Sequence, residues 1–136
     1  MRRQQTDEKD GRMTPAGENY LMMIHELSGG GKEPVRIRDL SSALGVTPSS
    51  ASRMATAMCA DGYVNFRRYG YITLTEKGIG RGEYMRDRLD TVKEYIARLN
   101  GFPSDDEAAS VAHCLSEETV AAMKEKIGGE NGEGHT

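Results

Sequence analysis

The sequence is short of cysteine, of histidine and of long apolar runs, and each shortage excludes a class of protein. Cys59 and Cys114 lie far apart and form no CxxC pair, which excludes a zinc finger and a disulfide framework. The histidines are His25, His113 and His135, and no HExxH motif, nucleophile elbow or phosphate loop accompanies them, so we expect no enzyme. No apolar run approaches the ~20 residues that span a bilayer, and no signal peptide appears, so we expect a cytoplasmic protein that does not enter a membrane.

The chain has no overall excess of positive charge, since the formal net charge is −3. The charge is unevenly placed, however. Between Arg36 and Arg88, nine basic and five acidic residues give a net charge of +4, whereas eight acidic residues and two lysines give −6 from Ser104 to the end. Counterion release acts locally at the phosphates, so a basic segment favours nucleic-acid binding even in an acidic chain. Ordinary solvated surface explains the acidic half equally well.

Residues 35–78 have the pattern of a winged helix-turn-helix. A helix over residues 37–44 leads through Gly45 to Thr47 and Pro48, an N-cap and a first-turn proline that begin a second helix running to about Asp61. Two short strands, residues 63–66 and 71–74, then flank a tight Arg68-Tyr69-Gly70 turn. The segment predicts a DNA-binding domain with a two-stranded wing, which a third short strand at residues 35–37 can join.

The remaining chain reads as helices, so the fold class is mainly α. Thr14 and Pro15 begin a first helix, Thr75 caps a long helix after the wing, Ser104 with Glu107 makes a capping box, and Ser116 caps a last helix. The expected buried stripe of the long helix is Tyr84, Leu89, Val92, Ile96 and Leu99. We expect a disordered N-terminus (1–12), a winged helix-turn-helix domain (13–75), a helical dimerisation and metal-sensing-like domain (76–127) and a disordered tail (128–136).

The second helix of the motif is expected to lie in the major groove of duplex DNA. The candidate DNA-binding residues are Arg36, Thr47, Ser49, Ser50, Arg53, Arg67 and Arg68. Arg53 is the candidate for a base contact, because arginine pairs with guanine through two hydrogen bonds, but a phosphate contact remains an equal alternative. Ala51, Met54, Ala55 and Met58 are expected to face inward.

With the flanking helices included, the chain resembles the DtxR/MntR family of metal-dependent transcriptional repressors. The segments that carry the resemblance are ENYLMMIHEL (18–27), LSSALGVTPSS (40–50), LTEKG (74–78) and AHCLS (112–116). The length resembles the shorter, manganese-sensing branch that lacks an SH3-like domain. The resemblance implies a homodimer built through the helices after the wing, which binds a palindromic operator when Fe²⁺ or Mn²⁺ is present.

The chain departs from the family at the metal ligands. The positions that correspond to them hold Asn19, Met22, either Asp87 or Leu89, Ala109, Ala112 and His113. Of these, only His113 is a conventional ligand, and alanine supplies no donor, so the six-ligand site of the family cannot be intact. Met22 is the second candidate ligand, because a thioether can bind a softer ion.

Three outcomes stay open for the input that controls the protein. In the first, metal control is lost. In the second, a rebuilt site for Fe²⁺, Cu⁺ or Zn²⁺ uses His113 with residues such as Met22, Glu18, His25, Cys114 or Asp87. In the third, Cys59 or Cys114 senses oxidation. The cofactor is accordingly Fe²⁺, Mn²⁺ or Zn²⁺, or none. A winged helix that answers to a small ligand, or one that binds protein instead of DNA, is the alternative function.

Overall fold

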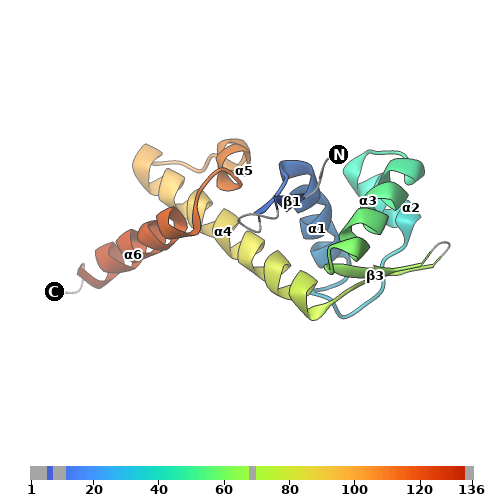
Figure 1. The fold of residues 1–136 in the computed structure, drawn as a ribbon. Helices are drawn as coiled ribbons and strands as arrows, with labels where there is room; N and C mark the ends of the chain where they lie inside the picture. The colour runs from blue at the N-terminus through green and yellow to red at the C-terminus, as the bar shows by residue number, and fades with distance from the viewer. Residues whose placement is uncertain (1–5, 8–11, 68–69, 134–136) are drawn as a thin grey trace. The chain divides into compact units, whose positions relative to one another are not determined.

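The computed structural model describes residues 6–7, 12–67 and 70–133. The elements in chain order are β1 (Thr6–Asp7), β2 (Arg12–Met13), α1 (Pro15–Leu27), α2 (Ile37–Leu44), α3 (Pro48–Ala60), β3 (Val64–Phe66), β4 (Ile72–Leu74), α4 (Glu76–Asn100), α5 (Asp105–Ala112) and α6 (Glu117–Glu133) (Figure 1). The chain forms two compact units, Met1–Met85 and Arg86–Thr136. The division falls inside α4, ten residues after the boundary expected at 75. The fold is mainly α, as expected.

The helix starts that define the DNA-binding motif are confirmed. The Thr14 hydroxyl accepts a hydrogen bond from the Gly17 amide at 3.1 Å. Thr47 caps α3 in the same way, accepting from the Ser50 amide at 3.1 Å, and a proline follows each cap. Gly45 ends α2 with a φ of 69°, the left-handed conformation that glycine adopts without strain. Sequence-local chemistry therefore sets the turn between α2 and α3.

The wing is an antiparallel pair in which Val64 faces Leu74 and Phe66 faces Ile72. The third strand expected at residues 35–37 is reduced to one bridge, in which Val35 and Ile72 exchange two backbone hydrogen bonds of 2.8 Å. The bridge ends there because Ile37 already belongs to α2. Arg68 and Tyr69 lie outside the described residues.

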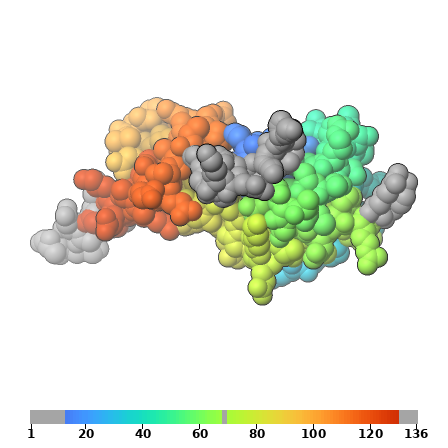
Figure 2. Space-filling view, in the orientation of Figure 1, coloured from blue at the N-terminus to red at the C-terminus, as the bar shows by residue number. Residues whose placement is uncertain are grey.

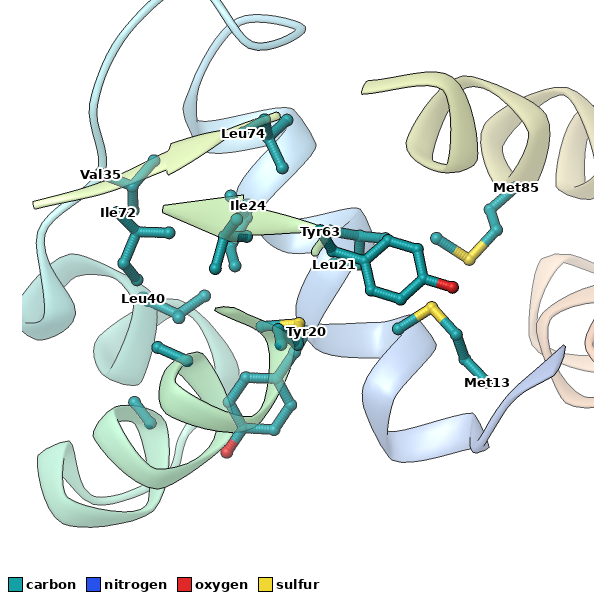
Figure 3. Close-up of a cluster of buried hydrophobic side chains, with 14 residues drawn as sticks. Met13, Tyr20, Leu21, Ile24, Val35, Leu40, Tyr63, Ile72, Leu74 and Met85 are labelled. Atoms are coloured by element: carbon teal, nitrogen blue, oxygen red, sulfur yellow. The ribbon is translucent and has the colours of Figure 1, made fainter. Parts of the chain in front are cut away.

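The core of the first unit joins all of its main elements. Its buried members include Leu21 and Ile24 from α1, Leu40 from α2, Met58 from α3 and Ile72 from the wing, each 0% exposed (Figure 3). Figure 3 shows Met13 and Met85 beside the Tyr63 ring, so the start of α4 belongs to this core. Burial of this apolar surface holds the wing and α3 in fixed positions.

The second unit has a much smaller core. Val92, Ala108 and Ala112 form its buried cluster, and Leu89, Ile96, Leu115 and Met123 pack against it from more exposed positions. The buried stripe expected along α4 is therefore wrong at Leu99, which is 70% exposed. The cluster that covers Val92 reaches only to Ile96 along α4, so the last turn of α4 lacks apolar cover within the described unit.

Two further expectations for the second unit differ from the structure. Ser104 precedes α5 without a side-chain cap, because its ψ of 79° departs from the 159° and 154° of the two threonine caps. Ser116 does cap α6, accepting from the Thr119 amide at 3.1 Å. The last helix, expected to end near Ile127, continues to Glu133.

The ends of the chain also differ from the expectation of disorder where they are described. Thr6–Asp7 pairs with Arg12–Met13 as two short strands. Residues 1–5, 8–11 and 134–136 lie outside the described part. Within the described part, no helix combines the length and apolarity that crossing a bilayer requires.

Candidate nucleic-acid interface and metal positions

One face of α3 is buried and the opposite face is open. Ala51, Ala55 and Met58 are 0% exposed, as the sequence predicts for the inward face, whereas Met54 is only partly buried. Ser49, Arg53 and Thr56, at positions i, i+4 and i+7, are exposed and share one stripe. Figure 2 shows the turn before α3 and α3 itself (teal to green) at the surface of the first unit. This stripe offers hydroxyl and guanidinium groups to a ligand.

The N-terminal turn of α3 is organised by its own side chains. The Thr47 hydroxyl donates to the Ser50 hydroxyl at 3.0 Å, and Arg53 Nη2 lies 3.5 Å from the same Ser50 oxygen. The Arg53 guanidinium is thereby drawn toward the end of the helix where the backbone amides carry partial positive charge. An anion at this end meets both the helix dipole and the arginine, which favours a phosphate or an electron-rich base edge.

A groove lies between the start of α2, the start of α3 and the wing. Its lining residues are Arg36, Ile37, Arg38, Pro48, Ser49, Ser52, Phe66, Gly70 and Tyr71. The Arg36 guanidinium lies 5.7 Å from the centre of the Tyr71 ring, a cation–π distance. The Tyr71 side chain is 51% exposed, so its ring is open to a ligand. The groove therefore combines two arginines with two aromatic rings and two serine hydroxyls.

The structure brings together most of the DNA-binding residues named from the sequence. Arg36 and Ser49 line the groove beside the wing, and Ser49, Ser50 and Arg53 line a second groove between α1 and α3. Arg67 is exposed on the wing, and Arg68 lies outside the described residues. Arg38, Ser52 and Tyr71 also line the groove beside the wing and were not predicted from the sequence. Ser52 follows Ser49 by one helical turn, so helical spacing was a signal that pointed to it.

In the first unit, the residues of α1 that were considered as metal ligands lie in different surroundings. Asn19 is exposed, and Met22 is half-buried and packs against the hydrophobic core. Glu18 is buried, and its Oε2 lies 3.2 Å from Nη2 of Arg81 on α4. His25 is also buried, and its Nε2 has no hydrogen-bond partner among the described residues.

In the second unit, His113 follows the last turn of α5 and is half-buried, with its Nδ1 3.5 Å from Sγ of exposed Cys114. Asp87 makes an ion pair with Lys124, and Leu89 packs in the hydrophobic cluster. Ala109 is exposed and Ala112 is buried. Among the described residues, His, Cys, Asp and Glu nowhere gather in threes around a point that a metal ion can occupy. This donor set does not fit the hard-oxygen site that Mn²⁺ or Fe²⁺ prefers.

The surroundings of Glu18 also affect Tyr63. Burial raises the pKa of the Tyr63 phenol above its ordinary value. The positive charge of Arg81 opposes this rise, and the negative charges of Asp61 and Glu18 add to it. The Lys77 ammonium lies 4.4 Å from the centre of the Tyr63 ring. Tyr63, Glu18 and Arg81 thus form one electrostatically connected group where α1 meets the first turns of α4.

Comparison with known proteins identifies the family of the domain that contains α3. Residues 12–72 match the family described as iron dependent repressor, N-terminal DNA binding domain. An uncharacterized HTH-type transcriptional regulator of Methanocaldococcus jannaschii is 31% identical over 115 residues, which cover 82% of this chain and 92% of that protein. The HTH-type transcriptional regulator MntR of Oceanobacillus iheyensis is 30% identical over 105 residues, covering 76% of this chain and 71% of that protein.

Solved structures share the fold. The crystal structure of T. acidophilum IdeR superimposes with a TM-score of 0.68 at 24% identity, covering 82% of this chain and 53% of that one. This chain thus spans about half of that structure. The relatives and the match to residues 12–72 together place the exposed stripe of α3 inside a known DNA-binding domain. The chain belongs to the iron-dependent repressor family of HTH-type transcriptional regulators, which includes MntR.

Proposed function

We propose that this regulator acts as a homodimer that binds a palindromic operator and represses transcription. The observation that carries the proposal is the amphipathic build of α3. Ala51, Ala55 and Met58 on its inner face are buried in the core, and its outer face presents Ser49, Arg53 and Thr56 beside two grooves. A helix held in this way enters a major groove without rearrangement of the core.

The candidate residues divide into two roles. Arg53, Ser49 and Ser50 lie on the first turns of α3 and read base edges or the adjacent phosphates. Arg36, Arg67 and Arg68, with Thr47 at the helix cap, position the domain on the phosphate backbone. Arg38 and Tyr71 join the second role, because they line the same groove as Arg36.

The second unit supports the dimer. Its own core is small, and it leaves Leu99 70%, Phe102 61% and Val111 37% exposed. Large apolar side chains that stay exposed on a small helical unit are typical of a surface that pairs with another chain. A second copy offers the same residues in return, as a symmetric dimer requires.

The proposal is tested by fluorescence anisotropy on a labelled duplex from the region upstream of the protein's own gene, with a scrambled duplex as control. We expect tighter binding to the upstream duplex, and a steep loss of affinity on both duplexes as the salt concentration rises. Equal, salt-insensitive binding to both duplexes would overturn the assignment to DNA. It would favour a winged helix that binds protein.

A further inference from the structure

Glu18 and Arg81 form a buried ion pair that joins α1 to α4. The two side chains are 4% and 16% exposed, and Arg81 Nη2 donates to Glu18 Oε2 at 3.2 Å across 63 residues of sequence. A carboxylate this deeply buried is unfavourable unless a cation neutralises it. The guanidinium supplies that cation, and its carbon also lies 5.1 Å from the centre of the Tyr84 ring.

A second contact brings the same two helices close together. A Cβ added to Gly82 of α4 would lie 2.6 Å from Cδ2 of His25 on α1, closer than real Cβ atoms approach other atoms. Glu18 and His25 are seven residues apart, so they lie on one face of α1, two turns from each other. This face of α1 therefore contacts α4 at two places, through the ion pair at Glu18 and through close packing at His25.

A metal ion that joined two helices would perform the same task as this ion pair. It would neutralise buried carboxylates and hold the helices together by charge. Here the positive charge is covalently part of α4, and the residues at the family's metal positions do not make a donor set for Mn²⁺ or Fe²⁺. We infer that the Glu18–Arg81 pair fastens α1 to α4 in place of a metal ion, so that this protein binds its operator without metal. This inference rests on the proposed function.

The first test compares the wild-type protein in chelator with the same protein after separate addition of Mn²⁺, Fe²⁺ and Zn²⁺. We expect its dissociation constant for the upstream duplex to change by less than about twofold, whereas a metal co-effector changes affinity by about 5- to 150-fold. We also expect the melting temperature to stay the same, because an ion that does not bind the native state cannot stabilise it. An increase in affinity with one metal, or a stoichiometric metal content after dialysis, would overturn the inference.

The two proposals fail in different ways. A protein that binds no duplex under any condition contradicts the proposed function, but its melting temperature with and without metal still tests the inference. A protein that binds the duplex only with metal keeps the proposed function and refutes the inference. His113 and Met22 would then be the candidate ligands of that metal.

Variants test the ion pair itself. Glu18→Gln should lower the melting temperature and weaken DNA binding in chelator, because it leaves the Arg81 charge without its partner, and added metal should not restore either. The matched control is Glu94→Gln, which breaks the exposed pair of Glu94 with Arg98 on the same helix α4 and should change neither property. If Glu18→Gln behaves like this control, the pair does not fasten the helices. Arg81→Lys, which keeps the charge, should lose less than Glu18→Gln.

Discussion

Arg53 is the side chain on which the sequence specificity of this regulator is expected to depend. It is exposed on α3, and its contact with Ser50 at 3.5 Å is weak enough to be exchanged for a DNA contact. Arg53→Ala should weaken binding to the upstream duplex by about 1–3 kcal/mol and weaken binding to scrambled DNA much less. Anisotropy titrations on both duplexes measure the difference. An equal loss on the two would make Arg53 a phosphate contact.

Tyr63 gives a prediction about pH. Because its pKa is raised in the folded protein, the native state favours the neutral phenol. The stability that this provides is present below the unfolded value of about 10 and is lost as the pH rises through the higher folded value. Tyr63→Phe removes this titration, so the free energy of unfolding should fall less between about pH 8 and pH 10.5 in the variant than in the wild type. Urea denaturation at both pH values checks this, and parallel losses in the two proteins would contradict it.

At the scale of single residues, polarity and spacing predicted burial along most of α3 and α4 and failed at the last turn of α4. The inward positions Ala51, Ala55 and Met58 are buried as expected. Leu99, expected inside, is exposed, and Glu18, expected as a ligand candidate, is a buried partner of Arg81. Sequence spacing identifies the face of a helix on which a residue lies, but the neighbours that cover this face are set by other elements.

The start of α4 contains two glycines that should respond in opposite ways to the same substitution. A Cβ at Gly78 would lie 2.0 Å from the backbone oxygen of Tyr63, whereas a Cβ at Gly80 would meet nothing within 4 Å. Gly78→Ala should therefore destabilise the protein by about 1–3 kcal/mol, since the helix must move away from the wing. Gly80→Ala should stabilise it by about 0.5–1 kcal/mol, because alanine favours the helix. Thermal unfolding compares the two, and a stable Gly78→Ala variant would show that α4 does not pack this closely.

Element boundaries could be predicted where they depend on a local side chain. Thr14, Thr47 and Ser116 each bond the backbone amide three residues ahead, and each was identified from its sequence neighbourhood. Ser104 has the same type of neighbourhood, but its backbone is turned away from the capping conformation. The direction in which the chain enters α5 sets the backbone conformation of Ser104. The residue types around Ser104 do not specify that direction.

At the scale of the whole molecule, the proposed dimer gives a direct prediction. Leu99 and Phe102 should be covered by the second copy, and burial of each side chain contributes about 1.5–3 kcal/mol to association. Leu99→Asp with Phe102→Asp should convert the dimer to a monomer whose helix content is unchanged. Sedimentation velocity with circular dichroism measures both properties. Asn100→Asp adds a charge nearby without removing apolar surface and should remain dimeric; a wild-type monomer would refute the dimer.

The sequence by itself determined the winged helix-turn-helix and the family, and from it we predict the loss of most of the family's metal ligands. Each of these depends on local chemistry: caps, a glycine turn, alternating strands and the absence of donor atoms at Ala109 and Ala112. Only the tertiary structure decided what Glu18 does, because its partner Arg81 is 63 residues away and nothing in the spacing connects them. Long-range pairs of this kind form when helices pack, so the electrostatic tie between α1 and α4 is a property of the fold and not of either segment.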